Sequence, residues 1–226
     1  MISLRIHHKT TYEYRQPVSL GPHHLMVRPR ESRDLRLLSS EVVTSPSGQI
    51  SWASDVFGNA VATIAFPAAT DRLVIDSMAR LELDALPWPV FDIAASAIVY
   101  PFQYSDDEWI DLGALTTQQY ADPASHFRTW AKGFVRGQTT DTLSLLKDLN
   151  ADLYTRIRYE IREDEGTQSP SQTLERGLGS CRDFAVLFVE AARSLGLGAR
   201  IVSGYLYDPQ RNLTGSRGSI CSGCGL

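Results

Sequence analysis

The pattern of apolar residues changes once along this chain, and that change limits the folds open to it. Residues 1–85 contain short runs in which apolar and polar residues alternate, whereas apolar residues after residue 122 recur at intervals of three and four. A period of two is typical of half-buried strands, and a period near 3.6 is typical of amphipathic helices. The sequence therefore predicts an α+β fold in which the strands come first and the helices follow.

Turn sequences separate the strand-like segments of the first 85 residues. The tripeptides PSG at 46–48 and FGN at 57–59 contain the residues that favour tight turns. Short strands at this spacing are typical of an antiparallel, sandwich-like module. We expect strands at residues 3–14, 23–30, 35–44, 50–56, 61–66 and 73–83.

A proline-rich stretch follows the strands and marks a change of module. Pro87, Pro89 and Pro101 each remove a backbone donor and disfavour helix in the residue before them. We therefore predict that this stretch is a linker, and the last residues show no periodicity at all. The expected parts are a β-rich region at 1–85, a linker at 86–121, an α+β core at 122–210 and an irregular tail at 211–226.

Helix signals dominate the second half of the chain. Asp122 before Pro123 is an N-cap followed by proline at the first helical position, which predicts a helix that stops at Gly137. A second helix is expected to start at Thr140 or Asp141. Apolar residues at spacings of three and four then predict one buried stripe. The stripe comprises Leu143, Leu146, Leu149, Leu153 and Ile157.

The stretch GLGSCRDFAVLFVEAARSLG at 177–196 predicts a third, amphipathic helix. Before it, Ser169 followed by Pro170 predicts a short helix or a turn, and residues 157–162 predict a short strand. After it, residues 199–208 predict another strand. The expected buried face of the helix consists of Phe184, Leu187, Phe188, Ala191 and Leu195.

Charge and composition narrow the classes of partner. A net charge of −4, a pI near 5.7 and scattered arginines argue against nucleic acid. No apolar run reaches the length that crosses a bilayer, and the N-terminus lacks the apolar region of a signal peptide. We therefore expect a cytoplasmic protein without a membrane partner. The three cysteines do not make a disulfide framework, and the oligomeric state stays open.

Cys181 stands where the third helix begins, directly after a Gly-Leu-Gly-Ser turn. A thiol with the ordinary pKa of about 8.5 is mostly protonated at neutral pH, but the N–H groups and positive potential of a helix N-terminus favour the thiolate. The same N–H groups can receive the oxyanion of an attacked carbonyl. Cys181 shares a helix face with Phe184 and Phe188, so we expect it to face into the fold. It is a candidate nucleophile, and the alternative is a small buried hydrophobe.

Four other residues near or after Cys181 have weaker signals. Arg182 would favour the thiolate and Asp183 would lie near the mouth of a substrate site, although both residue types are common on the surface of a first helical turn. Cys221 and Cys224 form a single C-x-x-C pair between glycines, whereas a structural zinc site needs four ligands. We therefore interpret that pair as part of a flexible tail.

All five histidines precede Cys181 in the chain. Adjacent residues on a strand point to opposite faces, so the pairs His7–His8 and His23–His24 each supply at most one inward ring. A metal site built from these pairs has no supporting cysteine or carboxylate spacing. His126 lies just after Asp122 and is expected at the surface or an interface. We expect none of the five to be catalytic.

Four segments of the sequence carry a resemblance to a known family. They are RIHHKTTYEYRQPVSLGPHHLMVRPR at 5–30, DVFGN at 55–59, LVIDSMARLEL at 73–83 and GSCRDFAVLFVEAARSLGLGARIVSGYL at 179–206. The first three are similar to the β-rich N-terminal region of bacterial transglutaminase-like proteins, and the last is similar to the segment around the nucleophile of those papain-like cysteine enzymes. The resemblance implies an antiparallel β module followed by a partial papain-like, transglutaminase-like α+β core, with Cys181 as the nucleophile.

This resemblance, which extends from about residue 2 to about residue 208, implies acyl transfer through a thioester on Cys181. The substrate would be a peptide or protein amide, and the acceptor would be water or an amine. Neither reaction requires a metal cofactor, and the chain has no calcium-loop pattern.

In this family a histidine and then an aspartate later in the chain complete the site. No histidine follows Cys181 here, and the only later aspartates are Asp183 and Asp208. Without a base and its orienting carboxylate, the thiol loses deprotonation and the return of the proton to the leaving group. We expect a C-terminally incomplete chain whose activity is impaired. The alternative is a truncated or degenerate homologue without catalysis that acts, if at all, as a binding module.

Overall fold

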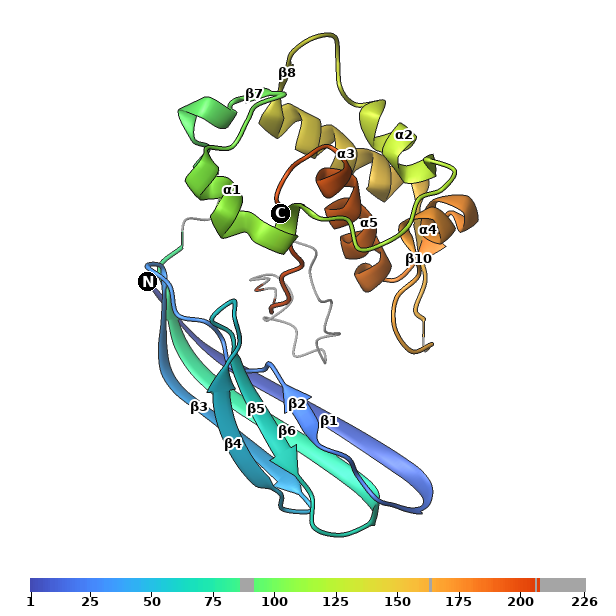
Figure 1. The fold of residues 1–226 in the computed structure, drawn as a ribbon. Helices are drawn as coiled ribbons and strands as arrows, with labels where there is room; N and C mark the ends of the chain where they lie inside the picture. The colour runs from blue at the N-terminus through green and yellow to red at the C-terminus, as the bar shows by residue number, and fades with distance from the viewer. Residues whose placement is uncertain (86–91, 163, 206, 208–226) are drawn as a thin grey trace. The chain divides into compact units, whose positions relative to one another are not determined.

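The computed structural model describes residues 1–85, 92–162, 164–205 and 207, and it divides the chain into two compact units (Figure 1). The first unit, Met1–Val90, consists of strands. The second, Phe91–Leu226, contains all the described helices. The α+β class expected from the change of periodicity is confirmed.

The first unit, which we call the β unit, contains two three-stranded sheets whose pairings are all antiparallel. The six expected strands are present, with bounds that differ by a few residues. The largest difference is in the second strand, which was expected to reach residue 30 and ends at Leu25. The sheets have the orders β1 (Ile2–Val18), β6 (Thr70–Leu83), β3 (Leu35–Ser45) and β2 (His23–Leu25), β5 (Ala60–Ala65), β4 (Gln49–Ser54).

The core of the β unit consists of alternate residues of the two central strands, β6 and β5. Every second residue of β6 from 73 to 81 is buried, and in β5 Ala62 and Ile64 are completely buried. The PSG turn packs against this core, because a Cβ atom on Gly48 would lie 2.6 Å from Cγ2 of Ile64. The turn glycine is therefore required by close packing.

The second unit, which we call the helical unit, begins inside the expected linker. Residues 92–121 carry helix α1 and strand β7, which pairs with β8. The sequence contained a signal for α1 that the prolines obscured, because Ser105 and Glu108 form a capping box. The elements are η1 (Ala95–Ala97), β7 (Val99–Tyr100), α1 (Asp106–Leu112), η2 (Gly113–Thr116), α2 (His126–Lys132), β8 (Thr140–Asp141), α3 (Thr142–Arg156), β9 (Arg158–Tyr159), α4 (Pro170–Arg176), β10 (Leu178–Gly179) and α5 (Cys181–Ser194).

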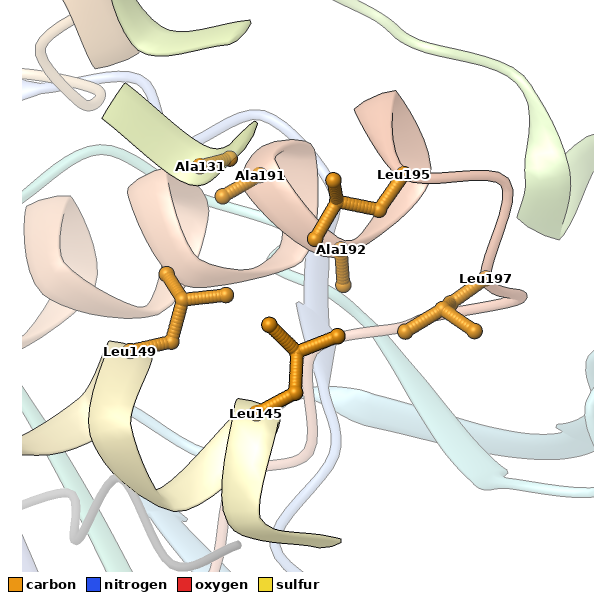
Figure 2. Close-up of a cluster of buried hydrophobic side chains, with 7 residues drawn as sticks. All are labelled: Ala131, Leu145, Leu149, Ala191, Ala192, Leu195 and Leu197. Atoms are coloured by element: carbon orange, nitrogen blue, oxygen red, sulfur yellow. The ribbon is translucent and has the colours of Figure 1, made fainter. Parts of the chain in front are cut away.

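Helix α5 is the centre of the helical unit, and α2, α3 and α4 pack against it (Figure 1). Figure 2 shows Leu145 and Leu149 of α3 directed toward α5, and Ala131 of α2 beside Ala191 of α5. A second cluster, nearer the start of α5, contains Phe127, Leu153, Ile157 and Leu187. The first cluster consists of Ala131, Leu145, Leu149, Ala191, Ala192, Leu195 and Leu197.

Two of the helix predictions need correction. Helix α2 begins at His126 and not at Pro123, because the Asp122 carboxylate accepts hydrogen bonds from the backbone N–H groups of His126 (2.7 Å) and Arg128 (3.1 Å). Asp122 is thus a cap that acts across a turn. On α3 the buried stripe contains Leu145, which is completely buried, in place of Leu143, which is half-buried.

The strand predicted at 199–208 is wrong for residues 199–205, which form no strand. The guanidinium of Arg193 donates to the carbonyl of Ala199 at 2.8 and 3.1 Å, and the N–H of Ala199 donates to the carbonyl of Leu115. These bonds occupy backbone groups of Ala199 that a strand partner would need. Residues 206 and 208–226, including Cys221, Cys224 and the expected tail, lie outside the described residues. None of the described helices is long and apolar enough to cross a membrane.

Candidate active site

Cys181 is the first residue of α5, as the sequence predicted, and its side chain is half-buried. Ser180 is the N-cap residue, with an extended backbone. The preceding helix α4 ends at Gly177, whose positive φ of 61° reverses the chain. Only Gly177, the two-residue strand β10 and Ser180 separate α4 from Cys181, so the thiol lies at a short junction between two helices.

Asp183 corrects the expectation of a first-turn surface residue, because it is completely buried. Its Oδ2 accepts hydrogen bonds from the backbone N–H and the hydroxyl of Ser180, both at 2.8 Å. The backbone N–H of Gln168 donates to Oδ1 at 2.7 Å, and the Gln168 side-chain amide donates to Oδ2 at 3.3 Å. The carboxylate thus joins the start of α5 to the segment before α4.

Arg162 supplies the charge that balances Asp183. Its Nη1 lies 2.9 and 3.0 Å from the two carboxylate oxygens, and its side chain is only 10% exposed. Burial alone would raise the pKa of the Asp183 carboxyl, but the hydrogen bonds from Ser180, Gln168 and Arg162 hold that pKa well below its usual range. Asp183 is therefore ionised throughout the neutral range.

The junction before Cys181 is closely packed. Strand β10 pairs in parallel with β9, and the carbonyl of Gly179 accepts a hydrogen bond from the N–H of Glu160 at 2.9 Å. A Cβ atom on Gly179 would lie 3.0 Å from Cβ of Asp183. A glycine at 179 therefore lets β10 pass directly over the buried carboxylate.

Sequence analysis missed Arg162 and Gln168. Neither stands in a motif, and each reaches Asp183 across 21 or 15 positions of the chain. The SCRD sequence revealed the helix start, but the paired arginine comes from the segment after β9 and has no local signature.

The histidines of the β unit lie on its strands, and adjacent rings differ in exposure as expected. His7 is exposed and 2.8 Å from Asp76, whereas His8 is half-buried. The exposed His126 lies on α2, and its Nδ1 is 3.0 Å from Glu175. Across the described part of the chain, no three His, Cys, Asp or Glu residues are grouped as metal ligands.

An apolar groove of about 710 Å³ lies within the helical unit, along one side of α5. Phe184 and Phe188 line it from α5, Leu153 and Tyr154 line it from α3, and residues 197–202 border it. The first residue of α5 that lines the groove, Phe184, comes three residues after Cys181.

Comparisons with known proteins agree with this arrangement. Residues 4–82 match the bacterial transglutaminase-like N-terminal region, and residues 128–222 match the transglutaminase-like superfamily, which confirms the resemblance found in the sequence. The second match contains Cys181. A search of curated proteins finds no match.

A solved structure shares the fold. It is described as "a Putative Cysteine Protease from Cytophaga hutchinsonii", with a TM-score of 0.62 and 16% sequence identity. The match covers 85% of this chain and 63% of that protein, so the chain spans about 63% of the length of the structure it resembles.

Proposed function

Because the helical unit has a transglutaminase-like cysteine-enzyme fold and follows a bacterial transglutaminase-like N-terminal region, we propose that Cys181 is a nucleophile for acyl transfer. The observation that carries the proposal is the position of Cys181, the first residue of α5 within the matched core. We assign the chemistry to residues 122–210.

The proposed reaction proceeds through a thioester. The Cys181 thiolate attacks an amide carbonyl carbon, and the first-turn N–H groups of α5 support the negative charge that develops on the oxygen. The C–N bond then breaks, and the nitrogen takes up from solvent a proton equivalent to the one that the thiol released, so that it leaves as the amine. Water or a second amine attacks the thioester and regenerates the thiol.

These 226 residues contain few candidates for the group that transfers the proton. No histidine follows Cys181 in the sequence, and His126, on α2, bonds to Glu175. We therefore propose that the 226-residue chain turns over amide substrates slowly or not at all. A second candidate for these 226 residues is a non-catalytic binding module, because they contain no histidine after Cys181.

The proposal also covers the substrate class and the compartment. A peptide or protein amide is the expected substrate, because a transglutaminase-like fold presents its thiol to acyl groups of this kind. The net charge of −4 favours a partner other than nucleic acid, and the sequence favours the cytoplasm without a membrane partner.

Thiol reactivity tests the proposal within a single chain. The full-length protein is treated with iodoacetamide at a series of pH values, and adducts are mapped at Cys181, Cys221 and Cys224. We expect Cys181 to reach half its maximal labelling rate well below pH 8, and below the two C-terminal cysteines, which serve as internal references. An ordinary thiol profile at Cys181 would contradict the proposed role.

Turnover of glutaminyl and simple amide substrates tests the proposal that this chain has little or no activity. We expect little or no product from this chain, with or without an added amine acceptor. Clear turnover that disappears in Cys181→Ala would establish an active enzyme and overturn the expectation of impaired activity.

A further inference from the structure

Asp183, two residues after Cys181 on α5, carries a buried charge. Its Oδ2 holds the backbone N–H and the hydroxyl of Ser180, the residue directly before the thiol. A residue whose N–H and hydroxyl are both bound to one fixed carboxylate cannot rotate without breaking both bonds. The conformation of Ser180 in turn decides where the first N–H groups of α5 point.

A carboxylate at this position carries an electrostatic cost for a thiolate. Negative charge close to Cys181 opposes formation of a second negative charge on the sulfur. Arg162 offsets that effect, since its Nη1 contacts both oxygens of Asp183 and its side chain is nearly buried. The pair therefore carries no net charge, while the hydrogen bonds of the carboxylate are retained.

We propose that Asp183 and Arg162 form a positioning pair for Cys181, in which the aspartate fixes the start of α5 and the arginine cancels the aspartate's charge at the sulfur. The inference rests on the proposed role of Cys181 and assigns two further residues to the same site. It predicts that loss of either residue shifts the pH dependence of Cys181 reactivity, and that the two shifts have opposite signs. An ion pair with a structural role alone would not produce opposite shifts.

The same helix contains a second buried carboxylate that serves as a comparison. Glu190 is 1% exposed, pairs with Arg193 at 2.8 Å and accepts hydrogen bonds from the backbone N–H groups of Gln119 and Tyr120. It lies nine residues after Cys181, or about 13 Å along a helix at 1.5 Å per residue. Loss of its charge disturbs the unit in a similar way but at a distance from the sulfur.

The test measures the pH at which Cys181 reaches half its maximal alkylation rate in the full-length chain. Asp183→Asn should move this midpoint to lower pH by roughly 0.5 to 1 unit, because it leaves the positive charge of Arg162 uncancelled. Arg162→Gln should move the midpoint to higher pH by a similar amount. The double variant should return close to the wild-type midpoint, because both charges are then absent.

Three controls separate this effect from general loosening. Asp164→Asn removes an exposed carboxylate that lies 3.5 Å from the same arginine, and it should leave the midpoint unchanged. Glu190→Gln should lower thermal stability without moving the midpoint. Arg162→Lys keeps the positive charge and should keep the midpoint close to that of the wild type, without most of the shift that Arg162→Gln produces. The proposal therefore stays testable even where Asp183→Asn does not fold.

The outcomes distinguish the pair from the proposed function. Midpoints that move in the same direction in both single variants, or that move equally in Glu190→Gln, would overturn the positioning pair. Opposite shifts in a chain whose wild-type Cys181 labels like the reference cysteines would support the pair and contradict the nucleophile. A low wild-type midpoint that neither variant moves would leave the nucleophile standing and overturn the pair.

Discussion

The β unit and the helical unit hold their charges in opposite ways. The ion pairs between strands of the β unit involve exposed or half-exposed side chains, as between Arg72 and Glu13, which are 61% and 77% exposed. The helical unit instead buries two carboxylates on α5, Asp183 and Glu190, each beside an arginine. The core of the β unit is built from alternating apolar residues, whereas the core of the helical unit encloses charge.

This difference predicts where single substitutions matter. Exposed ion pairs contribute little to the free energy of unfolding, because water and salt screen them. A buried charge that loses its partner is costly, because nothing replaces the interaction. Charge changes should therefore destabilise the helical unit far more than the β unit, while apolar truncations should affect both.

The largest effect is expected for Asp183→Ala. The substitution leaves Arg162 and the N–H groups of Ser180 and Gln168 without their acceptor, and should reduce the free energy of unfolding of the helical unit by about 3 kcal/mol or more. Hydrogen exchange with peptide resolution, measured across a urea series, reports each unit separately. Asp76→Ala in the β unit is the matched control and should cost less than about 1 kcal/mol. Equal losses in the two variants would contradict the comparison.

A truncation in the apolar core should give the β unit a loss of similar but slightly smaller size. Ile64 is completely buried, and Ile64→Ala should lower the free energy of unfolding of the β unit by about 3 kcal/mol at neutral and at acid pH alike. Val43→Ala is a control on β3, since Val43 is 55% exposed, and should cost under about 1 kcal/mol. Exchange protection that falls first in the helical unit would show that the two units do not unfold separately.

The two units also differ in how much of their structure could be predicted from the sequence. The six strands of the β unit could be predicted because period-two alternation is local, and each strand carries its own pattern. In the helical unit the start of α5 and the position of Cys181 were equally local. The partners of Asp183 were not, since Arg162 and Gln168 reach it only after the chain has folded back.

Two errors have the same origin. The start of α2 moved from Pro123 to His126 because the Asp122 side chain caps across a turn, which a dipeptide signal does not show. Residues 199–205 have the composition of a strand but form none, because Arg193 and Leu115 take backbone groups of Ala199. At both places, hydrogen bonds that the local residue pattern does not reveal override local propensity.

Acid should weaken the helical unit through Asp183. The folded pKa of this carboxyl is held well below the unfolded value of about 3.9, so its stabilising contribution is complete above the unfolded pKa and is lost as pH falls toward the folded pKa. Between pH 5 and pH 2.5 the loss should be roughly 2 kcal/mol. Urea unfolding followed by exchange at several pH values measures it. Asp183→Asn should flatten this slope, and an unchanged slope would assign the acid sensitivity to other groups.

The smallest effect is expected for the exposed pairs on the surface of each unit. His7→Ala removes an exposed pair with Asp76 in the β unit and should change the free energy of unfolding by about 0.5 kcal/mol or less. Where the His7 ring carries a charge, 0.5 M salt should shrink the change further, because screening acts on exposed charges. His126→Ala is its counterpart in the helical unit, where the ring faces Glu175 and both side chains are about half exposed. The two variants should behave alike, because the exposure of a pair, and not the unit that contains it, decides its contribution to the free energy of unfolding. A loss of 2 kcal/mol in His126→Ala alone would mean that the helical unit depends on its surface charges as well as on its buried ones.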